Sequence, residues 1–289
     1  MKFQNIKNLQ TFTTISEIKV AIAAYKKSSK SIGLVPTMGA LHQGHLALIE
    51  RAKQQNNITI CSIFVNPIQF NQLSDFEKYP NTLDADKMLL LTAGCDILFA
   101  PTVEQMYPFG LPELSINFGY QNTILEGRFR AGHFSGVGVV VSKLFNILQP
   151  TNAYFGQKDF QQCLVINQMV RELSSEVSIK IVEIVREADG LAMSSRNKRL
   201  NNQERMQATA IYQSLQMAES QLFTLNFEQI KRKAAEMLRN AGITMEYLDL
   251  VAFDTGILMY EPQRGTKYAL CIAAFLGEIR LIDNVVVIT

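Results

Sequence analysis

The sequence predicts an α/β protein, in which a Rossmann-like parallel sheet with helices on both faces is followed by a smaller α+β domain. Over residues 32–185, short apolar runs alternate with segments of helical periodicity, as they do in parallel sheets with right-handed crossovers. After Arg186 the pattern changes to two amphipathic helices and then three strand-like runs. At roughly 100–200 residues per domain, we expect two domains, over residues 1–185 and 186–289.

The strands are expected where short runs are apolar and rich in β-branched residues. The run at residues 58–65, ITICSIFV, is typical of a strand that is covered on both faces. Parallel strands are expected at residues 32–35, 58–65, 97–100, 153–155 and 178–185. Strands of the second domain are expected at residues 245–253, 268–274 and 279–288.

Helices are expected between these runs, where apolar residues recur at helical spacing and capping residues mark the ends. Residues 46–52 show this spacing after the first strand. In the helix expected at residues 82–93, Thr82 is the N-cap and Gly94 the C′ residue. Asn226 is the expected N-cap of the last helix. Further helices are expected at residues 135–148, 159–173, 202–222 and 226–241.

Composition and charge exclude several classes of protein. Apolar residues make up 47% and charged residues 19% of the chain, so an ordinary globular core is available. The net charge of +2 is too small to mark the whole chain for binding nucleic acid or a membrane surface. The longest apolar run, residues 268–276, is too short to span a bilayer, and residues 1–16 lack a continuous apolar segment. We therefore expect a cytoplasmic protein with no nucleic-acid and no membrane partner.

The cysteines give no indication of a metal site. Cys61, Cys95, Cys163 and Cys271 are scattered, form no C-x-x-C pair and have no nearby histidine that would complete a zinc site. They are therefore expected to be reduced packing residues, and no dedicated metal site is expected in the protein.

Two of the three histidines, His42 and His45, lie in the segment PTMGALHQGH, between the first expected strand and its helix. Ligands of open α/β sheets lie at the carboxyl ends of strands, and a helix N-terminus offers free N–H groups to an anion. Gly39 and Gly44 let the backbone approach a phosphate, to which two imidazoles can donate. A helix cap, or a pair of metal ligands, is the alternative for these histidines. The segment is neither a dinucleotide-binding fingerprint nor a P-loop.

Two further segments suit phosphate and also follow expected strands. FGQKD, at residues 155–159, opens a helix with Lys158, which can act as a point charge on a phosphate. The alternative is a solvated lysine. MSSRN, at residues 193–197, supplies hydroxyls, an amide and the guanidinium of Arg196. Alone, it is typical of a turn and a helix cap. Taken together, the three segments indicate one phosphate site.

Neutral amides and a basic, glycine-rich segment complete the candidate site. Gln69 follows the second long strand, and Gln162 lies on the helix after the lysine. Such amides suit the hydroxyls and the carboxylate of a small polar substrate, while each glutamine alone is more often a surface residue. The segment EGRFRAGHFSG, with Arg130 and His133, is either a lid or phosphate grip, or a loop held by Glu126.

Six segments between Pro36 and Asn197 form one pattern in a fixed order. They are PTMGALHQGH, SIFVNPIQF, YPNTLDAD, EGRFRAGHFSGV, YFGQKDFQQ and VREADGLAMSSRN. In these segments the chain closely resembles the pantoate-β-alanine ligase family, the pantothenate synthetases of the class I aminoacyl-tRNA synthetase-like superfamily. After Asn197, the resemblance lies in length and layout more than in motif.

The resemblance implies an ATP-dependent ligase that joins (R)-pantoate to β-alanine and releases pantothenate, AMP and pyrophosphate. The carboxylate of pantoate would attack the α-phosphorus of ATP, and the amine of β-alanine would then displace AMP from pantoyl adenylate. ATP would be a substrate accompanied by Mg²⁺, which phosphate oxygens and water largely hold. The family is typically a homodimer, whose smaller domain closes over the first as a lid.

The resemblance also implies roles for individual residues. The catalytic residues would be His42, His45, Lys158, Ser194, Ser195 and Arg196, with His45 as the proton donor. ATP would be bound by Met38, Gly39, Ala40, Leu41, His42, Gln43, Gly44, His45, Gly156, Gln157, Lys158, Asp159, Val185, Met193, Ser194, Ser195 and Arg196. Gln69 and Gln162 would bind pantoate, and Gln69 would also bind β-alanine. Gln157 departs from the family, which commonly has glutamate there, so no ionic role is expected at this position.

Two other functions share part of this pattern. A nucleotidyltransferase would use a similar H-x-G-H turn and leave the nucleotide on its product. A nucleotide-sensing module would bind ATP without turnover. The paired glutamines favour the ligase over the first alternative, and the complete set of His42, His45, Lys158 and Ser195 disfavours the second.

Overall fold

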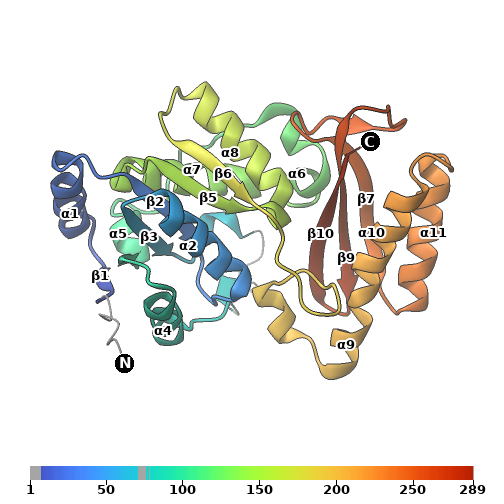
Figure 1. Cartoon of the computed structure of the whole chain (residues 1–289), viewed down its shortest axis with the longest axis horizontal. Coiled ribbons are helices and arrows are strands. Elements are labelled where there is room, and N and C mark those ends of the chain that lie inside the picture. Colours follow the sequence, from blue (N-terminus) through green and yellow to red (C-terminus); the bar gives the residue numbers. More distant parts are fainter. Residues whose placement is uncertain (1–7, 71–75, 78, 289) are drawn as a thin grey trace.

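The protein consists of two units that lie side by side (Figure 1). The computed structural model describes residues 8–70, 76–77 and 79–288, so the first seven residues, where the sequence predicts no targeting segment, lie outside it. The first unit contains a six-stranded parallel sheet and the second a four-stranded antiparallel sheet. The predicted α/β fold class is therefore confirmed. No helix in the described part of the chain is long and apolar enough to cross a membrane.

In the parallel sheet, the direction in which successive strands are added reverses once. Its strands are β1 (Gln10–Phe12), β2 (Ile32–Thr37), β3 (Ile58–Ile63), β4 (Ile97–Phe99), β5 (Asn152–Gly156) and β6 (Ser178–Val182), in the order β1-β4-β3-β2-β5-β6. The chain moves outward from β2 through β3 to β4 and then returns to place β5 on the other side of β2, where Leu34 pairs with Ala153. Open α/β sheets bind ligands at such switch points, outside the carboxyl ends of the strands.

Helices cover both faces of this sheet, because successive side chains of a strand point to opposite sides. The helices are α1 (Ile15–Lys27), α2 (Gln43–Gln55), α4 (Leu83–Ala93), α5 (Val103–Met106), α6 (Leu125–Phe129), α7 (His133–Leu148) and α8 (Phe160–Glu172), with 3-10 turns η1 (Pro67–Gln69), η2 (Gly119–Asn122) and η3 (Gln157–Asp159). Ile32 and Leu34 of β2 belong to the core that includes α1, α7 and α8. Val35 of the same strand faces the core that includes α2 and α4.

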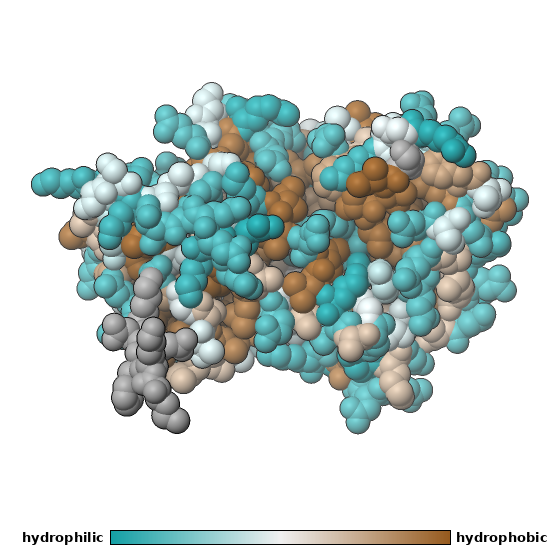
Figure 2. All heavy atoms as spheres, in the orientation of Figure 1, coloured by the Kyte–Doolittle hydropathy of each residue, from teal (hydrophilic) through white to brown (hydrophobic). Residues whose placement is uncertain are grey.

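The second unit packs its sheet between two helices and the first unit. It comprises η4 (Ser195–Arg199), α9 (Asn202–Gln207), α10 (Thr209–Gln221), α11 (Phe227–Asn240), β7 (Thr244–Ala252), β8 (Leu258–Met259), β9 (Lys267–Leu276) and β10 (Ile279–Ile288). One face of the sheet packs against α10 and α11. The other face meets α6 and the start of α8 through Tyr247, Val251 and Phe160. Figure 2 shows hydrophobic residues exposed near the middle of the molecule, where the two units adjoin.

A buried ion pair also joins the two units. Glu126 of α6 accepts two hydrogen bonds from Arg280 of β10, at 2.7 and 2.8 Å, and one from the Tyr247 hydroxyl at 2.9 Å. Burial alone would raise the pKa of Glu126, but the hydrogen bonds and charge of Arg280 lower it to about 2. The carboxylate is therefore ionised at neutral pH, and the C-terminal sheet is held to the first unit by charge as well as by apolar contact.

Most predicted elements match the observed ones. Gly94 ends α4 in the left-handed conformation with φ of 72°, and Asn226 caps α11, as the sequence predicts. All four cysteines are buried and free, as expected of packing residues. The strand predicted to reach residue 185 ends at Val182, because its neighbour β5 ends opposite that residue, at Gly156. The domain boundary near residue 185 stays a prediction.

Three differences have local causes. The helix predicted at residues 202–222 is two helices, α9 and α10, because the N–H of Ile211 donates to the carbonyl of Ala208, at 3.1 Å, and interrupts the α-helical bonding. β1 was not predicted, since it has only three residues and none of them is fully buried. α1 was missed because it buries only Ile18 and Ile22, which gives too narrow an apolar stripe.

Candidate functional site

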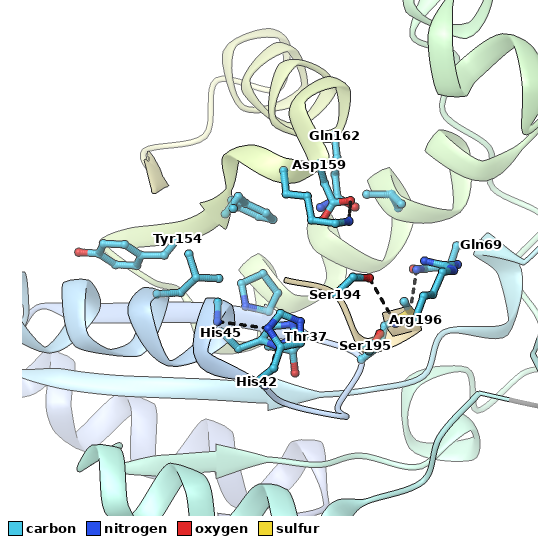
Figure 3. Close-up of a pocket in the computed structure, with 18 of the residues that line it drawn as sticks. Thr37, His42, His45, Gln69, Tyr154, Asp159, Gln162, Ser194, Ser195 and Arg196 are labelled. Carbon is cyan, nitrogen blue, oxygen red and sulfur yellow. Dashed lines mark hydrogen bonds and ion pairs between the residues drawn. The ribbon is translucent and has the colours of Figure 1, made fainter. Parts of the chain in front are cut away.

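A cavity of about 210 Å³ opens at the carboxyl ends of β2 and β5 (Figure 3). The candidate residues that line it are Met38, His42, Gly44, His45, Gln69, Gly156, Lys158, Asp159, Gln162, Val185, Met193, Ser194, Ser195 and Arg196. Figure 3 shows Asp159 and Gln162 across the cavity from His42 and His45. Three segments that lie far apart in the sequence therefore meet at one site.

Five other candidates lie in the described part of the chain but do not line this cavity: Gly39, Ala40, Leu41, Gln43 and Gln157. Ala40 and Leu41 are buried, whereas Gln43 is exposed at the start of α2. The side chain of Gln157 donates to Asn284 of β10 at 3.1 Å. The role of these residues in binding ATP stays a prediction.

A buried carboxylate from α4 holds the loop before the histidines. Asp86 is 2% exposed and accepts the N–H groups of Ala40 at 2.9 Å and Leu41 at 2.8 Å. Gly39 and Ala40 have φ of 85° and 51°, in the left-handed region that a residue with a side chain rarely adopts. Thr82 stands at the predicted N-cap position, but its hydroxyl donates to Asp86 at 3.0 Å and does not cap the helix. These two backbone N–H groups are thus bound by Asp86 and are not available to a ligand. The loop instead sets the position at which α2 and its histidines begin.

His42 and His45 cap α2 through one ring nitrogen each. Nδ1 of His42 accepts the N–H of Gly44 at 3.2 Å, and Nδ1 of His45 accepts the N–H of His42 at 3.3 Å. The helix-cap alternative is thus confirmed, and both rings also line the cavity, with their centroids 4.1 Å apart. A neutral imidazole whose Nδ1 accepts a hydrogen bond carries its proton on Nε2. Each ring therefore has one N–H donor left for a ligand.

Both imidazoles are neutral near pH 7. Burial, followed by the charges of Lys158 and Lys198, lowers the pKa of His42 to about 4. Burial, followed by the neighbouring His42, lowers the pKa of His45 to about 3. The pair therefore acts through hydrogen bonds and not as cations. Within the described ranges, no three His, Cys, Asp or Glu side chains form a group that could hold a metal ion.

Lys158 brings a positive charge to the cavity from the turn η3. Its side chain is only 17% exposed, and its Nζ lies 3.6 Å from Oδ1 of Asp159. A lysine this deeply buried does not fit the alternative of a solvated surface residue. Asp159 is half exposed, so solvent screens this ion pair. Lys158 can therefore still attract a second anion.

Residues 193–196 reach the cavity from a turn that follows β6. The hydroxyl of Ser194 accepts the N–H of Arg196 at 3.3 Å and caps η4, which confirms the turn-and-cap alternative for this serine. A backbone hydrogen bond of 3.0 Å from the N–H of Met193 to the carbonyl of Val185 brings both residues to the cavity wall. Ser195 and Arg196 line the cavity beside them.

A hydrogen-bond chain orients the amide of Gln69. Asn66 donates to Oε1 of Gln69 at 3.1 Å and to the carbonyl of Gly136 at 3.2 Å, and it accepts the hydroxyl of Tyr107 at 2.7 Å. Because a carbonyl only accepts, Gly136 fixes the orientation of Asn66, which in turn fixes that of Gln69. Nε2 of Gln69 then lies 2.9 Å from Sδ of Met38, on the cavity side. One N–H of Gln69 donates to this sulfur, and the second is left for a ligand such as a carboxylate or a hydroxyl.

Arg130 and His133 also line the cavity, and their contacts support the alternative in which Glu126 holds the segment, while a role as a lid or phosphate grip stays a prediction. Nη1 of Arg130 forms an ion pair with Oε2 of Glu126 at 3.6 Å. The same Nη1 lies 3.0 Å from Nε2 of His133. Since arginine only donates, Nε2 of His133 accepts and its Nδ1–H donates to the carbonyl of Gln69, at 2.9 Å. Burial, followed by the charge of Arg130, lowers the pKa of His133 to about 4. This imidazole is therefore neutral as well.

Several lining residues carry no signal in the sequence. Thr37, Phe64, Val140 and Tyr154 lie in or just after strands and helices, where the same residue types form the core. The sequence also does not reveal that Asp86 holds the loop. An acidic residue in the first turn of a helix is expected only to interact favourably with the helix dipole. Asp86 and Ala40 are 46 residues apart in the sequence, so no local pattern predicts their contact.

The chain is similar to proteins of one family over most of its length. Residues 10–286 match the family model of pantoate-beta-alanine ligase. The pantothenate synthetase of Cytophaga hutchinsonii is 46% identical over 287 residues, which cover 96% of this chain and 99% of that protein. The pantothenate synthetase of Bacteroides thetaiotaomicron is 42% identical over 279 residues, with 96% and 98% covered.

Solved structures with the same fold carry the same names. The structure of pantothenate synthetase from Thermus thermophilus superposes with a TM-score of 0.88 at 40% identity and covers 96% of this chain and 99% of its own. The pantoate-beta-alanine ligase of Francisella tularensis, complexed with Beta-gamma ATP and Beta-alanine, gives a TM-score of 0.82 at 35% identity, with 96% and 97% covered.

The lowered pKa values of His42, His45 and His133 predict that the protein loses stability as the pH falls. In the unfolded chain these imidazoles bind protons below about pH 6.5, whereas in the folded protein they stay neutral down to their pKa values of about 4, 3 and 4. The histidines should therefore cause no loss of stability above pH 6.5, and the free energy of unfolding should decrease as the pH falls from 6.5 to 5. Urea denaturation at pH 7.5, 6.5, 5.5 and 5.0 measures this.

The control for this prediction is His45→Gln, which removes one titrating group and should give a shallower loss over the same pH range. Below about pH 4.5 the protonation of Glu126 adds a loss of the same sign, because its folded pKa is about 2. A free energy of unfolding that rises as the pH falls from 6.5 to 5 would contradict the neutral histidines.

Proposed function

The chain belongs to the pantoate-β-alanine ligase family, and on this premise we propose that its cavity activates pantoate and then joins it to β-alanine. As a member of this family it is an enzyme that catalyses the ATP-dependent ligation of the two substrates. The observation that carries the proposal is that one cavity is lined by residues from each of the segments 38–45, 156–159 and 193–196. Each of these segments suits a phosphate, and the amides beside them suit a small hydroxy acid.

The reaction has two steps. In the first, a carboxylate oxygen of pantoate bonds to the α-phosphorus of ATP and pyrophosphate leaves with the electrons of the broken P–O bond. In the second, the amine of β-alanine bonds to the acyl carbon of pantoyl adenylate, loses a proton, and AMP leaves. No covalent bond to the protein is required, so the protein contributes positioning and stabilisation of the charge that develops at phosphorus.

The polar groups of the cavity divide this work. His42 and His45 donate their Nε2–H groups to phosphate oxygens, which neutral imidazoles can do at any pH above their lowered pKa values. Lys158 places its charge on the phosphates from the opposite segment. Ser194, Ser195 and Arg196 complete the nucleotide site, with the guanidinium as a further cation.

The two glutamines hold the acid that is activated. The amide nitrogen of Gln69 is turned toward the cavity by Asn66 and can donate to the carboxylate or the hydroxyls of pantoate. Gln162 lines the cavity from α8 and provides a second amide. Gln69 also binds β-alanine, so that the amine is held next to the carbonyl that it attacks.

Mg²⁺ accompanies the nucleotide in this proposal. Magnesium is usually bound through one or two carboxylates together with substrate phosphates and water, and Asp159, a half-exposed carboxylate at the cavity, fits that requirement. The ion would neutralise charge on the triphosphate. We further propose that the protein acts in the cytoplasm, and that the domain from residue 186 onward is a lid over the first domain.

Pantoate-dependent exchange of labelled pyrophosphate into ATP tests the order of the two steps. Exchange should require pantoate but not β-alanine, because adenylation is complete before the amine enters. Addition of β-alanine should then yield AMP and pantothenate in equal amounts. Release of ADP, or exchange in the absence of pantoate, would contradict the proposed reaction.

Lys158→Ala should lower the rate of this exchange by on the order of 10²-fold, the usual effect of losing one group that stabilises the transition state. The reason is that the lysine charge meets the phosphates from a largely buried position. Lys27→Ala, which removes an exposed lysine at the end of α1, is the matched control and should leave the rate unchanged. A Lys158→Ala rate near that of the unchanged protein would return Lys158 to the role of a structural residue.

A homodimer is the proposed assembly, supported by a short segment with exposed apolar side chains. Phe109, Leu111 and Leu114 are 102%, 57% and 69% exposed, and a patch of this kind favours contact with another chain. Sedimentation velocity should give twice the chain mass of 32.5 kDa, and Leu114→Asp should weaken the dimer. Val20→Asp, at an exposed apolar position of α1, is the control. A single-chain mass for the unchanged protein would contradict the homodimer.

A further inference from the structure

Strand β10 brings two adjacent buried polar residues, Asp283 and Asn284, to the segments that form the cavity. They are 4% and 1% exposed. They belong to the part of the chain after Asn197, for which the sequence predicts no site residue. Buried polar side chains are costly unless each polar group finds a partner, so the partners of these two residues show what they hold.

Asn284 binds the segment of Lys158 with its whole amide group. Its Nδ2 donates to the carbonyl of Gln157 at 2.9 Å and to the carbonyl of Lys158 at 3.0 Å. Its Oδ1 accepts Nε2 of Gln157 at 3.1 Å. Since both carbonyls can only accept, the orientation of the amide is fixed. One side chain from the second unit therefore uses both of its N–H groups and its oxygen on the first unit.

The Lys158 segment has few other constraints of its own. η3 has no side-chain cap, and neither does the helix α8 that follows it. No atom lies within 4 Å of the position that a Cβ would take at Gly156, the residue before η3. Gly156 before the turn is held by pairing with Val182, and Phe160 after it is buried. Between these points, the hydrogen bonds from Asn284 restrain the lysine backbone directly.

Asp283 holds the other phosphate-side segment in the same way. Arg186 donates to both carboxylate oxygens of Asp283, at 2.6 and 3.0 Å, and to the carbonyl of Asn284 at 3.0 Å. Its guanidinium also lies over the ring of Tyr212, 3.8 Å from the centroid. Arg186 starts the hairpin that leads to residues 193–196, since it bridges Ala192. Consecutive residues of β10 thus restrain both segments at one edge.

We propose that Asn284 is a positioning residue for the adenylation step, which acts by holding Lys158 at the cavity. This inference rests on the proposed function, because it assigns Asn284 to the transfer at phosphorus. Asn284 does not line the cavity itself. Its effect is on where the Lys158 charge lies relative to the triphosphate, and a displacement of about 1 Å in such a group is enough to lower a rate by about 10²-fold.

A double-mutant cycle in the full-length protein tests this inference, with exchange of labelled pyrophosphate into ATP as the assay. Asn284→Ala should lower the maximal exchange rate about 10- to 100-fold and leave the KM for pantoate unchanged, since Gln69 and Gln162 are not displaced. In the Lys158→Ala background the same change should lower the rate less than about 2-fold, because the two effects share one cause. Asn146→Ala, which removes an exposed helical asparagine, is the control and should have no effect.

A milder variant covers the case in which Asn284→Ala does not fold. Gln157→Ala removes only the bond to Oδ1 of Asn284 and should lower the maximal rate about 2- to 5-fold, again only when Lys158 is present. Equal losses with and without Lys158, or a raised KM for pantoate with an unchanged maximal rate, would overturn the role of Asn284. Absence of pantoate-dependent exchange in the unchanged protein would instead overturn the proposed function.

Discussion

The carboxylate of Asp86 fixes the loop on which the rest of the site is built. It accepts two backbone N–H groups of the loop between β2 and α2, at 2.8 and 2.9 Å, and is itself almost completely buried. Without it, two buried N–H groups would have no partner, at a cost of about 1–3 kcal/mol each. The bonds also offset the strained left-handed conformation of Ala40, whereas Gly39 adopts its positive φ without strain. The fixed turn then starts α2 at the point where both histidines face the cavity.

The burial that supports this turn also decides what the histidines can do. With pKa values of about 4 and 3, His42 and His45 bring hydrogen-bond donors to the cavity but no charge. The positive charge comes from Lys158, Arg130 and Arg196, which line the same space. A net charge of only +2 for the whole chain is compatible with binding a triphosphate, because the cations are gathered locally where the ligand lies.

The sequence was sufficient to predict the parts of the structure that depend on neighbouring residues. Strand–turn–helix order, the glycine at the end of α4 and the asparagine cap of α11 follow from patterns within a few residues. The partners Asp86–Ala40, Glu126–Arg280 and Gln157–Asn284 are separated by 46, 154 and 127 residues. These contacts depend on how the elements pack, so the sequence does not predict them. From residue type and position alone, Asp86 is expected only to favour the helix dipole, Glu126 only to hold its own loop, and Asn284 is not expected at the site.

The same long-range contacts limit how the second unit can move. A swing of the whole C-terminal sheet away from the parallel sheet would separate Arg280 from Glu126 and Asn284 from the Lys158 segment. Such a swing would break the hydrogen bonds of this buried ion pair, and the apolar contacts of Tyr247 with α6 would be lost as well. None of the residues of η4 (Ser195–Arg199) is buried, so this turn can shift toward a ligand without breaking those contacts. Within the proposed lid domain, closure over the cavity therefore costs least when this turn moves and the sheet stays in place.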